Sequence, residues 1–395
     1  MNKTSSVSHG GCVTPSAFPW VPLVSLTGFA IASGYLMSLI PLALAPLGLA
    51  PHLAAWLASA FYAGLLLGAT FSARIVATLG HRRALVMFLG IVLLSITAMA
   101  AIKGQGVWLL ARFVAGVAIA GVFVVVESWL LMADSDRQRA KRLGFYMAAL
   151  YGGNALGQLG VGYVGVTGNQ PYWLIGGLIT LAIMVPLFAR HGEPRREEGH
   201  SARLGSLKSL RKAAYIGCLV SGLTLGAVYG LLPLYLAERV SDHQQVGAMM
   251  ALVIVGGMAV QPVIGLVSAR MSKVLLMTWL CVIGTAAVAL IAFAGSQWQM
   301  GIGLVVLGAA VFAIYPVAIT YACVGLAAEK IVAATEVLLL AYSVGSVSGP
   351  LLADNAFSGT DGLMTYLAVC LLSTAVYMLV MYVKERRQMP DLSAA

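Results

Sequence analysis

Residues 34–45 read GYLMSLIPLALA, and residues 226–237 read GAVYGLLPLYLA. The two stretches are offset by 192 residues, and five glycine or proline pairs keep this offset without a gap. These pairs are Gly34 with Gly226, Pro41 with Pro233, Gly116 with Gly308, Gly153 with Gly345, and Gly157 with Gly349. Self-similarity at a fixed offset indicates a duplicated architecture. The chain is therefore predicted to contain two halves of the same fold.

The composition places both halves in a membrane. Of the 395 residues, 60% are hydrophobic and 10% are charged, and the mean hydropathy is +0.91. Soluble proteins have roughly 45–50% apolar and 25% charged residues, and a water-soluble globule could not bury this much apolar surface. Collagen, coiled coil and intrinsic disorder are excluded by the same figures.

Twelve apolar stretches are long enough to cross a bilayer as helices, which satisfy their own backbone hydrogen bonds. They lie at about residues 20–46, 53–73, 84–102, 107–133, 143–167, 172–189, 213–237, 246–268, 274–294, 299–327, 332–353 and 362–383. We predict an all-α integral membrane fold with two six-helix bundles in the same orientation, enclosing a cavity between them. The predicted parts are an N-terminal bundle (1–190), a cytoplasmic linker (191–212) and a C-terminal bundle (213–395).

The basic residues orient these spans. Of the 24 Lys and Arg residues, 21 fall in segments on one side of the predicted membrane, Lys103 and Arg239 fall on the other, and Arg112 lies within a span. Basic residues near span ends are retained in the cytoplasm. Both termini are therefore predicted to be cytoplasmic, and the net charge of +10 reflects topology rather than nucleic-acid binding.

Other classes of site lack their residues. The five cysteines form no Cys-x-x-Cys pair, and the six histidines are predicted to lie in loops or the N-terminus, so neither a zinc nor a haem site is expected. No P-loop and no Gly-x-Ser-x-Gly sequence is present. We expect no cofactor, no metal and no catalytic residues.

With its two six-span halves, the chain resembles the major facilitator superfamily over essentially its whole length. Within that superfamily it most resembles the bacterial YcaD-type subgroup of permeases, through the sequences VVVESWL (124–130), GLLPLYL (230–236) and YSVGSVSGP (342–350). The loop at 73–83 resembles the family's gating motif through Gly80, Arg82 and Arg83 but lacks its aspartate. Plain positive-inside residues explain the two arginines equally well.

Arg112 also matches the family's Arg-x3-Gly motif, and its partner in the repeat is Leu304. A charge within a span is costly and normally faces a cavity, although snorkelling toward the outer end is an alternative. Glu127 and Glu336 are the in-span carboxylates. Each is a candidate for proton coupling or for gating, and Glu127 lies ~22 Å along the helix from Arg112.

The remaining candidates are polar, small or kinking residues within spans. Gly153, Gly157, Gly345 and Gly349 are expected to pack helices closely, whereas Asn154 and Gln158 could face the cavity. Gly157 is followed by Gln158, not by the proline of the family's antiporter motif, although Pro350 follows Gly349. Pro41 and Pro233 are expected to kink the first span of each half. Five residues are candidates for the cavity lining: Tyr151, Tyr229, Gln261, Tyr315 and Tyr342.

The resemblance implies a secondary transporter in a bacterial inner membrane that moves a small organic solute by alternating access. The expected partners are that solute, protons and the lipid bilayer, and the protein is expected to work as a monomer. The alternatives are an integral membrane lipid-modifying enzyme, which would need an acid/base cluster near one interface, and a channel or sensor, which would conduct far faster than a transporter.

Overall fold

The computed structural model describes residues 20–131, 136–189, 211–240, 242–324, 326, 328–357, 359 and 361–388. These residues form twelve α-helices, as predicted. The first six are α1 (Trp20–Ala43), α2 (Leu53–Leu79), α3 (His81–Ala101), α4 (Gln105–Leu131), α5 (Asp136–Tyr163) and α6 (Gln170–Phe188). The second six are α7 (Lys212–Arg239), α8 (His243–Arg270), α9 (Lys273–Ala292), α10 (Gln297–Cys323), α11 (Ala328–Ala356) and α12 (Gly362–Gln388). The predicted linker and both termini lie mostly or wholly outside the described residues.

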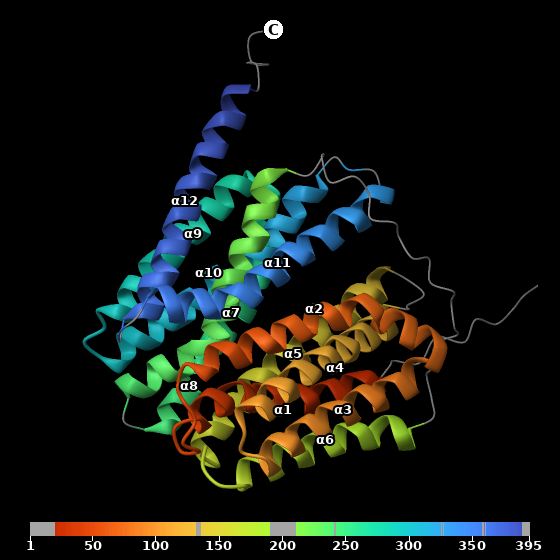
Figure 1. Cartoon of the computed structure of the whole chain (residues 1–395). Coiled ribbons are helices and arrows are strands. Elements are labelled where there is room, and N and C mark those ends of the chain that lie inside the picture. Colours follow the sequence, from red (N-terminus) through yellow and green to blue (C-terminus); the bar gives the residue numbers. More distant parts are fainter. Residues whose placement is uncertain are drawn as a thin grey trace, which may run out of the picture.

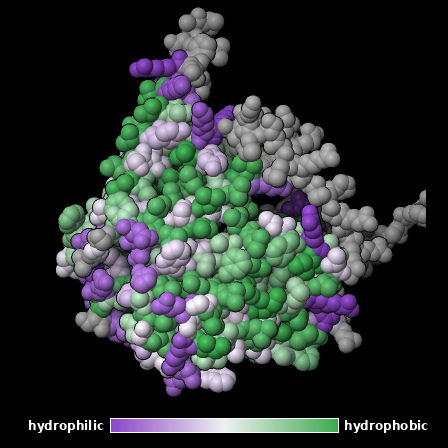
Figure 2. Space-filling view, in the orientation of Figure 1, coloured by the Kyte–Doolittle hydropathy of each residue, from purple (hydrophilic) through white to green (hydrophobic). Residues whose placement is uncertain are grey.

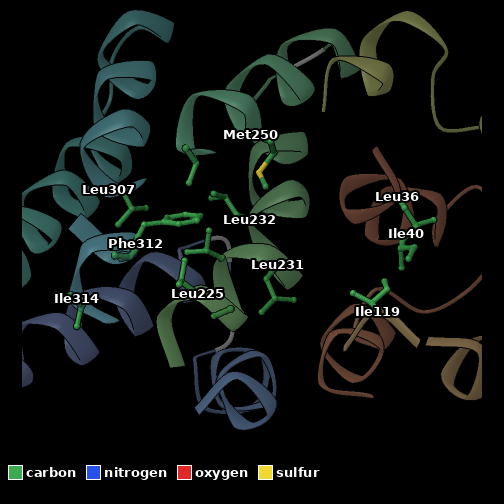
Figure 3. Packing of buried hydrophobic residues seen from close by; sticks show 14 of the residues in the cluster. Leu36, Ile40, Ile119, Leu225, Leu231, Leu232, Met250, Leu307, Phe312 and Ile314 are labelled. Carbon is green, nitrogen blue, oxygen red and sulfur yellow. The ribbon is translucent and has the colours of Figure 1, made fainter. Parts of the chain in front are cut away.

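Each set of six helices packs mainly within itself. In the first, α2 packs on α4, α1 on α5 and α6, and α3 on α4 and α6; in the second, α11 packs on α7, α10 on α8 and α9, and α12 on α9. Figure 3 shows Leu36, Ile40 and Ile119 gathered in the first half, and Leu225, Leu307 and Phe312 in the second. We call these sets the N-half and the C-half.

The 192-residue repeat extends to individual backbone contacts. A Cβ on Gly157 would lie 2.1 Å from the carbonyl oxygen of Ile31, and a Cβ on Gly349 would lie 2.3 Å from that of Leu223, which stands 192 residues after Ile31. Another pair, Gly64 and Gly256, meets the carbonyl oxygens of Phe113 and Val305 at 2.0 and 2.1 Å in the same way. Only glycine allows such close helix approach.

Eleven of the helices are long and apolar enough to cross a membrane. The exception is α5, whose sequence contains glycines, Asn154 and Gln158. This helix packs against α1 in its own half and α8 in the other. Gln158 is buried and Asn154 is partly buried, so protein covers these two polar side chains.

Five large exposed aromatic residues lie at one end of the bundle, while Trp20, Phe188 and Trp279 lie at or toward the other end. Trp56, Tyr163, Trp173, Phe293 and Trp298, each at least half exposed, lie at or near the helix ends where α2, α6 and α10 begin and where α5 and α9 finish. Amphipathic aromatic side chains favour the membrane–water interface. Figure 2 shows a broad hydrophobic band between hydrophilic ends, as expected for a protein that crosses a bilayer.

The two halves meet at the end of the bundle that carries these five aromatic residues, and they diverge from it. There the Ser59 hydroxyl donates to the Val347 carbonyl oxygen at 2.7 Å, joining α2 to α11. A Cβ on Gly162 would lie 2.5 Å from Cα of Gln244, where α5 reaches α8. Figure 1 shows the halves in contact near α8 and spreading apart toward the end where the chain's C-terminus lies. We call these the closed end and the open end.

Candidate functional site

Arg112 is buried between the N-half and the C-half, near the closed end. It stands seven residues into α4, roughly 10 Å along the helix at 1.5 Å per residue. Its side chain is 8% exposed, and its guanidinium carbon lies 4.2 Å from the centroid of the Phe61 ring. The Nε atom is buried without a hydrogen-bond partner among the described residues. The arginine therefore points into the protein and not toward the lipid surface.

A pocket opens beside this guanidinium, with about 370 Å³ of empty space including its mouth. We call it the central pocket, because α1, α2 and α4 of the N-half and α7 of the C-half all line it. Its lining residues are Met37, Ile40, Pro41, Ala54, Ala58, Phe61, Tyr62, Arg112, Tyr229 and Gly230. Pro41, predicted only as a kink, thus forms part of the wall of the pocket.

Aromatic side chains from both halves continue from this pocket toward the open end. Phe312 makes edge contacts with Tyr151 (centroids 5.7 Å apart) and Tyr229 (5.9 Å). Tyr315 and Tyr342 follow, with ring centroids 4.9 Å apart. The structure thus brings together the four tyrosines predicted to line a cavity. Phe61, Tyr62 and Phe312 join them, and no sequence signal separates these three from other aromatic residues in spans.

Glu127 lies further along α4 than Arg112, toward the open end. It is exposed, and the hydroxyl of the buried Tyr146 donates to its Oε1 at 2.6 Å. Glu336, on α11, is also exposed. Both carboxylates therefore lie where solvent from the open end can reach them, and neither contacts Arg112.

Gln158, Asn154 and Gln261 occupy three different surroundings. Gln158 is fully buried, accepts a hydrogen bond of 2.6 Å from the Ser38 hydroxyl, and has no partner for Nε2 among the described residues. Its backbone oxygen would lie 2.4 Å from a Cβ on Gly247 of α8, so it belongs to the closed end. Asn154 and Gln261 each donate to a carbonyl of their own helix, those of Leu150 and Gly257. None of the three lines the central pocket.

The loop arginines and His81 lie at the open end. Arg82 donates from Nε to the carbonyl oxygen of Pro186, near the last residue of α6, and Arg83 is exposed. The prediction that every histidine lies in a loop or the N-terminus is wrong: His243 is the first residue of α8, and His81 begins α3, is 7% exposed and lies 3.1 Å from the Ser128 hydroxyl. Helix α2 ends at Leu79 and α3 begins at His81, so the loop between them is shorter than expected.

Comparisons with known proteins agree with this architecture. A family model described as Major Facilitator Superfamily matches residues 23–350, so the chain belongs to the major facilitator superfamily. A second model, described as small membrane protein KPN01023-like, matches residues 361–390. The MFS-type transporter YcaD from Salmonella dublin is 30% identical over 93% of this chain and 96% of its own length. YcaD from Escherichia coli is 32% identical over 83% of this chain and 86% of its own length.

Solved structures of transporters share the fold. The nucleoside transporter NupG aligns with 92% of this chain and 98% of its own at a TM-score of 0.70 and 13% identity. A D-xylose–proton symporter aligns with 92% of this chain and 97% of its own, at a TM-score of 0.69 and 13% identity. These neighbours confirm the predicted fold class, and the family indicates a membrane transporter rather than an enzyme.

Proposed function

We propose that this protein is a secondary transporter that carries a small organic solute across the bacterial inner membrane by rocking the N-half (1–190) against the C-half (213–395). One observation carries the proposal. The contacts between the halves seal one end, while the buried Arg112 guanidinium and aromatic side chains from both halves line the space beneath the seal. This is the geometry of one of the two states that alternating access requires.

The charge pattern supports a cytoplasmic open end. Arg82, Arg83, Arg270 and Lys273 belong to this end, whereas Lys103 lies at the closed end. Basic residues near spans favour the cytoplasm. We therefore propose that this is an inward-open state, with the closed end facing the periplasm.

A bulky residue at Gly247 tests the rocking motion. Its Cβ would already lie 2.4 Å from the backbone oxygen of Gln158, so a tryptophan there should separate α5 from α8 and favour the outward-open state. The readout is a single cysteine at Met37 in a background without the native cysteines. Labelling of that cysteine by an impermeant maleimide, added outside intact cells, should rise in Gly247→Trp.

Gly265→Trp is the matched control. It lies on the same helix, and nothing lies within 4 Å of the place that a Cβ would take there, so labelling of the Met37 cysteine from outside should not rise. Unchanged labelling in a folded Gly247→Trp variant would mean that the closed end is not a moving gate.

We also propose that Glu127 or Glu336 couples transport to protons, because both carboxylates lie on membrane-spanning helices and are exposed toward the open end. Glu127→Gln keeps an acceptor for the Tyr146 hydroxyl, so the local fold should persist. In reconstituted vesicles, gradient-driven accumulation should fall to the level of empty vesicles while solute exchange at equal pH continues. Accumulation that is unaffected by both Glu127→Gln and Glu336→Gln would exclude coupling through these two acids.

A further inference from the structure

A second hollow lies inside the N-half, separate from the space between the halves. It contains about 400 Å³ of empty space when the part open to solvent is included, and residues of α1, α2, α3, α4 and α6 line it. We call it the bundle cavity. Met37, Phe61 and Arg112 line both this cavity and the central pocket, so the guanidinium lies where the two spaces meet.

The walls of the bundle cavity are almost entirely hydrocarbon. Phe29, Leu36, Val92, Ile96 and Ile119 represent the side chains that line it, and Ser33 and Arg112 are its polar members. Ligand sites are typically lined by apolar side chains with a few placed polar groups. The cavity matches this description, with one positive charge at its junction with the central pocket.

Arg112 has no anionic partner in the part of the chain that the structure describes. Its Nε is buried and unbonded, and its guanidinium carbon lies 4.2 Å from the centroid of the Phe61 ring. A buried cation without a hydrogen-bonded counter-charge is unfavourable. A ligand that brings a carboxylate would supply the missing partner, and guanidinium binds carboxylates with matched planar geometry.

We propose that the transported solute is an amphiphilic organic anion, whose carboxylate binds Arg112 from the central pocket and whose hydrocarbon body occupies the bundle cavity. This inference rests on the proposed transporter function and names its substrate class. A hydrated inorganic anion would gain nothing from apolar walls, and a cationic solute would be repelled by the guanidinium.

Binding of fatty acids to the full-length protein in lipid nanodiscs tests the proposal, with empty nanodiscs subtracted. Radiolabelled octanoate is the probe, and unlabelled compounds compete with it. Each added methylene from butanoate to octanoate should tighten binding about fourfold, as expected for burial of a CH₂ group. Methyl octanoate, which lacks the charge, should compete at least tenfold less well than octanoate, the loss expected when a charged hydrogen bond is removed.

Two variants separate the charge from the cavity. Arg112→Gln should weaken octanoate binding at least tenfold and abolish the preference over the methyl ester. Ile96→Phe places a larger side chain in the wall, which narrows the cavity and should remove the gain in affinity from longer fatty acids. Leu94→Phe, at a 70% exposed position on the same helix, should preserve that gain.

Equal binding of octanoate and its methyl ester to the wild type would overturn the proposal, whether or not any variant folds. Equal binding of acetate and octanoate would reduce the site to a simple anion site and overturn the role of the cavity. These measurements use no gradient. A protein that binds octanoate but moves no solute would therefore contradict the transporter function alone, while transport of an unrelated solute would contradict only this substrate class.

Discussion

Arg112→Leu is expected to make the protein more resistant to thermal unfolding while abolishing its capture of solute. The arginine is a buried charge whose Nε has no hydrogen-bond partner among the described residues, and the replacement of buried ions by apolar residues is often stabilising by about 1–4 kcal/mol. The loss of its contact with the Phe61 ring offsets about 0.5–2 kcal/mol of this gain. The expected net effect is about 1 kcal/mol, a rise of about 1 °C in Tm for a chain of this length.

The repeat shows that a leucine fits this position in the fold. Leu304 occupies the equivalent place on α10 and is fully buried. Lys103→Leu is the control, because this lysine is exposed at the closed end and its removal should change stability by no more than about 0.5 kcal/mol. Unfolding of the purified variants can be followed by tryptophan fluorescence. A lower Tm for Arg112→Leu would show that the arginine has a structural partner and is not held for a ligand.

Gly157→Ala is expected to destabilise the N-half strongly. The added Cβ would lie 2.1 Å from the carbonyl oxygen of Ile31 and 2.8 Å from the nitrogen of Tyr35. Both are backbone atoms of α1, so the clash cannot be relieved by turning a side chain, and the helices must separate. Overpacking typically costs 1–3 kcal/mol, and we expect about 3 kcal/mol here, with reduced expression of folded protein.

Gly152→Ala is the matched control on the same helix. A Cβ at this position would have no other atom within 4 Å, and alanine is favoured over glycine in a helix by roughly 0.5–1 kcal/mol. The two variants differ only in the face of α5 that receives the methyl group. Monodispersity on size-exclusion chromatography and the Tm of each protein give the comparison. Equal stability of the two variants would contradict the close approach of α1 and α5.

The fold could be predicted because its signals are distributed along the whole chain. Apolar stretch lengths gave the twelve helices, and the offset between Gly34 and Gly226 gave the duplication. The sequence was less informative about the site, because lining a pocket depends on which face of a helix meets which neighbour. Gln158 illustrates this point: its polarity suggested the cavity, but it is buried at the closed end, where the Ser38 hydroxyl donates to it.

Phe61 and Phe312 illustrate the converse. Nothing in their sequence surroundings distinguishes them from phenylalanines that face lipid, yet one stacks on Arg112 and the other joins tyrosines of two halves. The bundle cavity is also invisible in the sequence, because it is a volume left between five helices. Charged residues were better indicators, since the cost of burying Arg112 marked it before its surroundings were known.

The polarity of α5 has a consequence for how the chain is assembled in the bilayer. A helix that carries an asparagine and a glutamine gains little from contact with lipid alone. Its neighbour α1 precedes it by about a hundred residues and is already in the membrane when α5 emerges during synthesis. Ser38 and the close glycine contacts of α1 then give α5 a partner on arrival, so early insertion of α1 prepares the place that α5 takes.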